Sequence, residues 1–225
     1  MKTKRRNNAP PRARVRTRSR VSARPALGPR FEEALAFANR LHATQKKKGT
    51  EVPYMAHLLG VTSIVLTAGA DEDLAIAALL HDGPEDQGGR PLLRKIERKF
   101  GKRVAVIVDA CTDTYDEPKP AWRPRKEKYI AGIGKRAAEA RLVSAADKLH
   151  NCRQILEDHR QIGDAVFDRF TGKKKGTLWY YRALVEAYRR AGTNVIVEEL
   201  DRVVTELERR ARGAHPAGGG VPCPA

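Results

Sequence analysis

A histidine and three carboxylates stand within six consecutive positions of the sequence. His81, Asp82, Glu85 and Asp86 directly follow an apolar, helix-forming stretch, and Gly83-Pro84 between them predicts that the helix stops there. A folded domain buries such a stretch, and ionisable groups beside a buried surface must be paired or must bind a metal. Imidazole nitrogen and carboxylate oxygen together suit a borderline divalent ion such as manganese, iron, cobalt or zinc. The pattern therefore predicts a divalent-metal site that other segments complete.

Two residues elsewhere in the chain have the chemistry to complete that site. His57 opens a predicted helix, and Asp147 lies among the apolar residues of another, four positions before Asn151 and on the same helix face. A buried aspartate without a partner is costly, so Asp147 needs a cation or hydrogen bonds. The alternative is a surface ion pair between Asp147 and either Lys148 or Arg153.

Two lysine runs lie outside these segments. Residues 46–48 form a basic loop that leads towards His57, so a functional role competes with the usual interpretation of such a run as a solvated turn. Residues 173–175 precede Thr177, which is expected to cap the next helix. Trp179 and Tyr180 lie off the apolar stripe of that helix, so one of them is a candidate to stack on a base. Packing into the core is the alternative.

Helical periodicity dominates the sequence, and no set of partner strands is visible, so the predicted fold is all-α. The apolar run at 104–111 is short and valine-rich, which also suits a strand, but its neighbours favour a helix. Residues 87–90 and 113–125 are predicted loops. The predicted helices cover residues 31–45, 57–68, 74–80, 91–100, 104–111, 126–134, 136–153, 178–190 and 194–212.

The chain has 225 residues and a formal net charge of +17, and the charge is concentrated at one end. Residues 1–30 contain eleven Lys or Arg and no acidic residue, so the remainder carries +6. We predict a disordered Arg-rich arm over residues 1–30, one domain over 31–212 and a flexible tail over 213–225. The arm is either a non-specific contact for nucleic acid or a solvated tail without a partner, including one translated from too early a start codon.

Cysteine content and hydropathy suggest the compartment. The three cysteines are far apart and form no CxxC pair, which is typical of the reducing cytoplasm. No run of about 18 apolar residues occurs, and the basic N-terminus has no apolar segment behind it. We expect a cytoplasmic protein without a membrane-spanning segment or a secretory signal.

The order His57, His81-Asp82, Asp147 resembles the H…HD…D signature of the HD superfamily of metal-dependent phosphohydrolases, whose core is an all-α helical bundle. Three longer motifs resemble its alarmone hydrolase branch, the hydrolase half of RelA/SpoT-type stringent-response enzymes and their small relatives. These motifs are HATQKKKGTEVPYMAHL from His42, HDGPED from His81 and ADKLHN from Ala146. Leu58 replaces a usual proline, Lys46-Lys47 replace Arg-Lys, and the family's nucleotide-binding segment is not recognisable after Glu157.

The resemblance implies a site and a reaction. One divalent ion, with manganese expected, would be bound by His57, His81, Asp82 and Asp147 and would activate a water. Glu85 and Asp86 match the family's catalytic acidic pair. The implied reaction is removal of the 3′-pyrophosphate from guanosine tetraphosphate or pentaphosphate. The residues implied to contact the substrate are Lys46, Lys47, Lys48, Asn151 and Arg153.

Other interpretations of the same residues remain open. Glu85 and Asp86 could instead cap the following element. The site could serve a nucleotide phosphatase acting on a nucleoside monophosphate or NADPH, because the C-terminal third departs from the family pattern. A non-catalytic nucleic-acid-binding protein that uses the basic arm is a third interpretation. The sequence leaves the base preference and the oligomeric state open.

Overall fold

The computed structural model describes residues 27–213, and throughout this range the regular elements are helices. The predicted all-α fold is therefore confirmed. Outside the helices, Lys46 and Pro53 form one isolated antiparallel bridge. No helix among residues 27–213 is both long and apolar enough to cross a membrane. The α-helices are α1 (Pro29–Leu41), α2 (Met55–Thr67), α3 (Glu72–Leu80), α4 (Gly89–Phe100), α5 (Lys102–Cys111), α6 (Trp122–Gly132), α7 (Ala138–Ile162), α8 (Lys173–Ala191) and α9 (Val195–Ala211).

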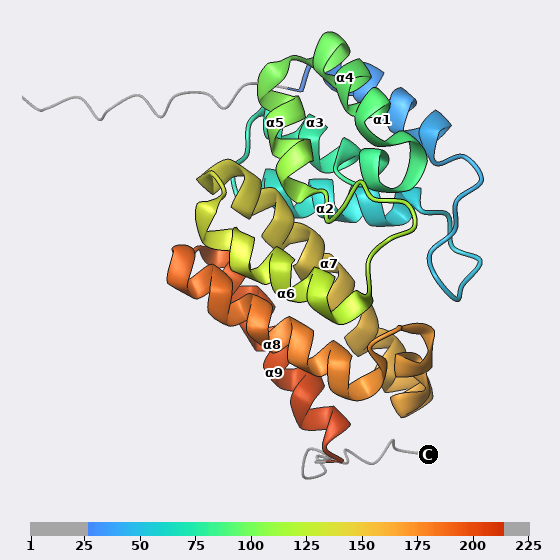
Figure 1. The fold of residues 1–225 in the computed structure, drawn as a ribbon, viewed down its shortest axis with the longest axis vertical. Coiled ribbons are helices and arrows are strands. Elements are labelled where there is room, and N and C mark those ends of the chain that lie inside the picture. The colour runs from blue at the N-terminus through green and yellow to red at the C-terminus, as the bar shows by residue number, and fades with distance from the viewer. Residues whose placement is uncertain (1–26, 214–225) are drawn as a thin grey trace, which may run out of the picture.

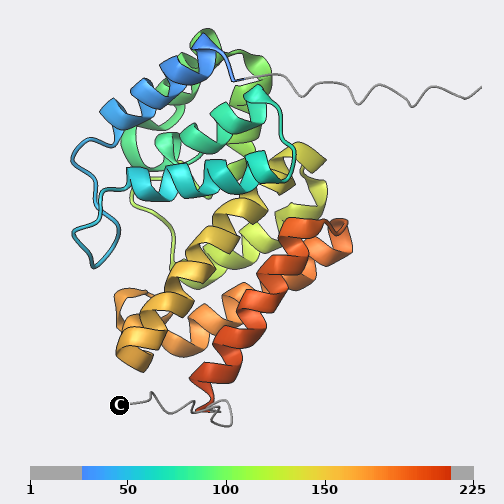
Figure 2. The same cartoon turned by 180° about the vertical axis from the view of Figure 1, so that it is seen from behind.

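The long helix α7 joins two groups of helices (Figure 1). It packs against α2, α3 and α5 of one group and against α8 and α9 of the other. Figure 2 shows α9 lying along α7 on the side opposite to α6. Residues on α7 can therefore contribute both to the α2–α3 region and to the surface formed with α6 and α8.

Helix α3 is the most deeply buried element of the N-terminal group. All residues from Leu74 to Leu80 are buried, as the apolar stretch predicts. The side chain of Asp71 accepts a hydrogen bond from the backbone N–H of Leu74 at 3.1 Å and so caps the start of α3. A rigid, solvent-free helix thus ends directly at His81, which fixes the position of that side chain.

The segment after His81-Asp82 differs from the prediction. The sequence predicts a loop at 87–90 and a helix from Pro91, whereas Pro84–Gly88 forms a π-helical turn and α4 begins at Gly89. The dihedrals of Gly83 remain helical, at φ −53° and ψ −53°. Helix α3 ends at Leu80, as the sequence predicts. Proline is tolerated in a first helical turn because its missing N–H would have no partner there, so Pro84 can start the next helical turn. π-Helical turns are rare and frequent at functional sites.

Several other boundaries also shift. Arg30, which the sequence assigns to the disordered arm, lies in α1 and donates hydrogen bonds to Glu72 at 3.1 Å, Asp73 at 2.8 Å and the carbonyl of Phe100 at 2.8 Å. Residues 1–26, which hold the rest of the predicted arm, and the predicted tail from residue 214 lie outside the described residues. The loop after residue 112 ends where α6 begins, at Trp122.

Thr177 does not cap α8, so that prediction is wrong. The helix begins at Lys173, and Thr177 is a buried residue in its second turn. Lysine is a good helix former, so Lys174 and Lys175 extend the helix backwards, and Lys173 begins it with a φ of +50°. A β-carbon on Gly172 would lie 2.7 Å from the Trp122 ring, and one on Gly176 3.2 Å from it. The two glycines therefore let α8 approach Trp122 of α6 closely.

Candidate active site

Three buried side chains from three helices converge at the junction of α2, α3 and α7. His57 is the third residue of α2, His81 directly follows α3, and Asp147 lies inside α7. The Nε2 atoms of the two histidines are 3.4 Å apart. Oδ1 of Asp147 is 3.4 Å from His57 Nε2 and 3.7 Å from His81 Nε2. Such close, mutually facing donor atoms are suited to sharing one cation.

Asp82 provides a second carboxylate beside the two histidines. Its Oδ2 lies 3.0 Å from His81 Nε2 and 3.3 Å from His57 Nε2. Its side chain is 21% exposed, whereas that of Asp147 is 7% exposed, so Asp82 is the more accessible of the two carboxylates. The structure therefore brings together all four residues of the predicted ligand set, which we call the metal corner: His57, His81, Asp82 and Asp147.

The electrostatics of the metal corner favour a positive charge. Burial alone would lower the pKa of His81, but Asp82 and Asp147 outweigh it and hold this pKa well above its usual value. The pKa of His57 is raised in the same way. Burial alone would raise the pKa of Asp82 and Asp147, yet both pKa values are well below normal, owing chiefly to His81 for Asp82 and to Lys148 for Asp147. Protons on the histidines and a divalent cation thus compete for the same position.

The far side of each histidine ring is also occupied. His81 Nδ1 is 2.8 Å from the carbonyl oxygen of Ala78. Because a carbonyl only accepts, Nδ1 carries the proton and the lone pair of Nε2 faces the metal corner in the neutral ring. His57 Nδ1 lies 3.0 Å from Nδ1 of His150. Both rings thus present Nε2, as ligation of one ion requires.

Three polar side chains hold the carboxylates of the metal corner. The hydroxyl of Tyr54 donates to Asp82 Oδ2 at 2.6 Å, and the amide of Asn151 donates to Asp147 Oδ1 at 2.6 Å. Lys148 pairs with the other oxygen of Asp147. Burial and then Asp82 raise the pKa of Tyr54, which keeps its hydroxyl a donor. The predicted surface pair between Asp147 and Lys148 does form, but Asp147 is buried and faces the histidines as well.

Glu85 and Asp86 lie in the π-helical turn that follows the metal corner. Glu85 accepts from the backbone N–H of Asp113 at 3.1 Å and from Lys119 at 2.9 Å. Asp86 accepts from the Gln45 amide at 2.8 Å. Burial, followed by the negative charges of Asp82 and Glu85, raises the pKa of Asp86. Both carboxylates line a polar hollow of about 680 Å³ together with Lys119, on the solvent side of the turn.

A cavity of about 330 Å³ opens beside His57 and is enclosed by α6, α7, α8 and the 46–50 loop. Of the predicted substrate contacts, Lys47, Lys48 and Asn151 line it, whereas Lys46 and Arg153 do not. Lys46 pairs with Glu51 at the surface, and Arg153 donates to Glu199 of α9 at 3.0 Å. The lining consists of Lys47, Lys48, Thr50, Tyr54, His57, Trp122, Lys126, Lys148, Asn151, Gln154, Ile155, Asp158, Arg169, Phe170, Thr177, Tyr180 and Tyr181.

The aromatic wall of this cavity was not assigned from the sequence, apart from Tyr180 as one of two stacking candidates. Trp122 and Tyr180 line it from α6 and α8, with ring centroids 6.2 Å apart. The Tyr180 hydroxyl is buried and has no hydrogen-bond partner among residues 27–213. The signals that could have located Trp122 are Gly172 and Gly176, but they can be interpreted only once α6 and α8 are seen to pack together.

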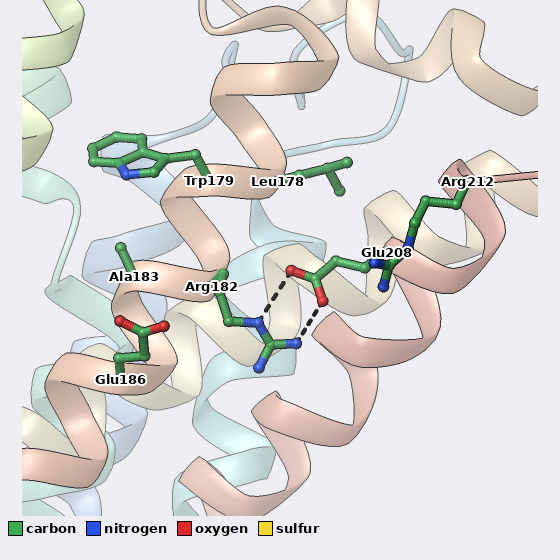
Figure 3. A pocket seen from close by; sticks show the side chains of 7 residues that line it. All are labelled: Leu178, Trp179, Arg182, Ala183, Glu186, Glu208 and Arg212. Atoms are coloured by element: carbon green, nitrogen blue, oxygen red, sulfur yellow. Dashed lines mark hydrogen bonds and ion pairs between the residues drawn. The ribbon is translucent and has the colours of Figure 1, made fainter.

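Trp179, the other stacking candidate, faces elsewhere. It lines a separate pocket of about 370 Å³ between α8 and α9 (Figure 3). Arg182 and Glu208 cross that pocket with hydrogen bonds of 3.1 and 2.7 Å. The Arg123 guanidinium lies 3.3 Å from the centroid of the Trp179 ring. Trp179 therefore packs at the helix surface and does not reach the cavity beside His57.

The second lysine run also points away from the cavity. Lys173 pairs with Asp168, and Lys174 donates to Asp164 at 2.6 Å and to the carbonyl of Ala211 at 2.5 Å. These bonds fasten the start of α8 to the preceding turn and to the end of α9. The run acts as a structural clamp.

Comparison with known proteins identifies the family. A family model described as "HD domain" matches residues 34–177. The chain belongs to the HD domain family. Over 126 residues it is 38% identical to the guanosine-3′,5′-bis(diphosphate) 3′-pyrophosphohydrolase MESH1 of Xenopus tropicalis, covering 55% of this chain and 68% of that protein. Over 166 residues it is 37% identical to the guanosine-3′,5′-bis(diphosphate) 3′-pyrophosphohydrolase of Aquifex aeolicus, covering 72% of this chain and 20% of the relative.

Solved structures with a similar fold agree with this family membership. One, titled "A metazoan ortholog of SpoT hydrolyzes ppGpp and plays a role in starvation responses", matches with a TM-score of 0.67 at 29% identity, covering 86% of this HD-domain protein and 100% of that chain. A protein from Listeria monocytogenes EGD-e matches with a TM-score of 0.60 at 26% identity, covering 67% and 97%. The predicted resemblance to HD-type alarmone hydrolases is confirmed.

Proposed function

We propose that this HD-domain protein hydrolyses the 3′-pyrophosphate of guanosine tetraphosphate or pentaphosphate and releases pyrophosphate. The observation that carries the proposal is the convergence of His57, His81, Asp82 and Asp147 at the edge of a lysine-lined cavity. Relatives named as 3′-pyrophosphohydrolases of this nucleotide support the choice of substrate. Water attacks the phosphorus next to the 3′-oxygen, the bond between them breaks, and the nucleoside product takes up a proton on that oxygen. This product is the diphosphate from the tetraphosphate and the triphosphate from the pentaphosphate.

The metal corner would hold one divalent ion through two imidazole nitrogens and two carboxylates. The donor set fits, because both Nε2 atoms face inward and the carboxylates offset the ionic charge. Nitrogen and carboxylate ligands together suit manganese, which we propose as the ion. When bound, the ion lowers the pKa of water and polarises a phosphoryl oxygen.

Glu85 and Asp86 are proposed as the acid–base pair. The backbone N–H of Asp86 bonds the carbonyl of Asp82 at 3.0 Å, so the π-helical turn ties the pair to the metal corner. Gln45 orients the Asp86 carboxylate. A carboxylate with a raised pKa accepts and returns a proton closer to neutral pH than an ordinary one, which suits Asp86 to the shuttle. Glu85 is proposed to orient the attacking water.

The cavity beside His57 is proposed to hold the nucleotide. Lys47 and Lys48 approach from the loop, and Lys126 and Lys148 from α6 and α7, so cationic donors surround the cavity as an anionic substrate requires. Lys126 and Lys148 take the place of Lys46 and Arg153 in the predicted set. Trp122 supplies the aromatic surface for the base, and Asn151 supplies an amide at the boundary with the metal corner.

The test is product analysis with the full-length chain and added manganese. Guanosine tetraphosphate should yield pyrophosphate, without orthophosphate, and His81→Ala should yield neither. A panel with nucleoside monophosphates and NADPH is the comparison. If orthophosphate is released from those substrates while guanosine tetraphosphate stays intact, the protein is a nucleotide phosphatase and the proposed substrate is wrong.

The Arg-rich segment keeps its separate hypothesis of non-specific nucleic-acid contact, since residues 1–26 hold most of the excess charge. Deletion of residues 1–26 should abolish retention on RNA or DNA and leave hydrolysis unchanged. Loss of hydrolysis on this deletion would contradict the proposed division of the chain.

A further inference from the structure

We propose that His150 and Gly60 form a positioning pair that fixes the proton of His57 and so makes its Nε2 atom a metal ligand. The inference rests on the proposed metal site. His150 lies on α7 and touches His57 with its ring, at a centroid distance of 4.9 Å and an interplanar angle of 67°. It lies within the ADKLHN motif, which gives it no role of its own.

The hydrogen bond between the two rings admits only one useful arrangement of protons. The two Nδ1 atoms are 3.0 Å apart, so one must donate and the other must accept. If His57 donates, its Nε2 lone pair faces Asp82, His81 and Asp147 and is free to bind an ion. If His150 donates, the neutral His57 ring carries its proton on Nε2, pointing into the metal corner where an ion would sit.

The two histidines of the metal corner are therefore held by different means. For His81 the partner is the carbonyl of Ala78, which can only accept, so the backbone alone fixes the proton. For His57 the partner is a side chain, and the same result requires a neutral His150 ring with its own proton on Nε2. The ligating form of His57 thus depends on a residue that can be substituted.

Gly60 provides the space in which His150 reaches His57. It lies one turn after His57 on α2, on the face towards α7. A β-carbon at this position would lie 2.2 Å from both Cδ2 and Nε2 of the His150 ring, far inside van der Waals contact. Glycine inside a helix is less favourable than alanine, so its presence in α2 has a packing reason. That reason is the His150 ring.

The experiment measures affinity for Mn²⁺ alone, by titration of the metal-free protein against a competing chelator. In His150→Phe an apolar ring fills the space and the acceptor is lost, so the dissociation constant should rise about 10–100-fold. In His150→Asn the side-chain oxygen lies near the former Nδ1 position and accepts the same bond, so affinity should recover most of the way to wild type. A structural role of the ring alone predicts the opposite ranking.

Gly60→Ala tests the same contact from the other helix. It should weaken Mn²⁺ binding by displacing His150, although it touches no proposed ligand. Gly132→Ala is the matched control, because the nearest atom to its added β-carbon is 3.9 Å away, in Arg136. In the double variant Gly60→Ala, His150→Ala the glycine substitution should have no further effect, because the ring it displaces is gone.

The outcomes separate this inference from the metal site itself. If His81→Ala loses Mn²⁺ binding while His150→Phe and Gly60→Ala bind like wild type, the metal site stands and the positioning pair is wrong. If the wild-type protein binds no Mn²⁺, both the proposed metal site and the positioning pair are wrong. Thermal unfolding of each metal-free variant distinguishes a weakened site from a damaged fold.

Discussion

The metal corner and the wall of the neighbouring cavity are built on different principles. At the metal corner, each histidine presents Nε2 inward, and partners such as Ala78 and Tyr54 hold the surrounding groups from outside. On the cavity wall, the cationic groups are held by other protein side chains. Lys47 donates to Gln154 at 2.6 Å, Arg169 to Asp158 at 2.5 Å and Lys126 to Asp113 at 2.7 Å.

This difference indicates a division of labour. The metal corner is organised before any ligand arrives, which suits it to one small cation and to transition-state stabilisation. The wall must exchange internal partners for phosphate oxygens, so part of its binding energy is spent on breaking existing bonds. Substitutions at the metal corner should therefore act on kcat, and substitutions on the wall should act on KM.

The largest effect is expected from Asp147→Asn. The variant keeps the size of the side chain but removes the charge that serves both the ion and Lys148. Activity should fall by about a thousandfold or more, because activation of water at neutral pH depends on the bound ion. Metal content and kcat at saturating Mn²⁺ are the measurements. Retention of activity within about tenfold would place the reaction outside the metal corner.

Glu85→Gln should have the next largest effect. The amide keeps the contact with the backbone of Asp113 but cannot orient water or accept a proton as a carboxylate does. We expect kcat to fall by about 10²–10⁴-fold while Mn²⁺ affinity is retained. Glu97→Gln, at an exposed position on α4, is the matched control and should match wild type. If kcat were equal in both variants, Glu85 would have no role in the reaction and would act only as a capping residue.

Lys47→Met tests the wall. The side chain keeps most of its length and loses its charge, so guanosine tetraphosphate loses one charge-assisted donor. Such a bond contributes about 1.5–3 kcal/mol, which corresponds to a rise in KM of about tenfold or more. The value of kcat should change little. A fall in kcat at constant KM would show that the wall takes part in the chemical step. The proposed difference in role between the metal corner and the wall would then be wrong.

Trp122→Leu tests the aromatic part of the wall. Base stacking is worth about 1–3 kcal/mol, so KM should rise about five- to a hundredfold. Trp179→Leu is the comparison, because Trp179 packs on the Trp122 ring with centroids 6.1 Å apart but lines the separate pocket in Figure 3. Comparable increases in KM for both variants would mean that Trp122 acts through packing against α8.

The sequence predicted the metal corner better than the wall for a physical reason. His57, His81 and Asp147 stand at helix starts, helix ends or on apolar faces, where an ionisable group is conspicuous. Their convergence follows from how helices bury their apolar sides. No comparable sequence signal exists for Trp122 and Tyr180, because an aromatic residue on an amphipathic helix has the same sequence pattern whether it faces a core or a cavity.

Local backbone chemistry explains the remaining errors. Helix α3 ends before Gly83-Pro84 as predicted, but the residues after it form a π-helical turn and not a loop, because proline is compatible with the start of a helical turn. Arg30 looks like part of a charged arm until Glu72 and Asp73 are placed beside it. Tyr54 and His150 support the metal corner from positions whose partners are distant in sequence, so only the packed structure reveals their contacts.

The smallest effect is expected from Lys174→Met, the counterpart of Lys47→Met in the second lysine run. The Lys174 side chain is 41% exposed, and it donates hydrogen bonds to Asp164 and to the carbonyl of Ala211. Its loss should leave KM and kcat unchanged and lower the unfolding free energy by about 1 kcal/mol or less, as for other exposed pairs. Two similar lysine runs would then differ only in what the fold places opposite them. A raised KM for Lys174→Met would extend the substrate surface to the start of α8.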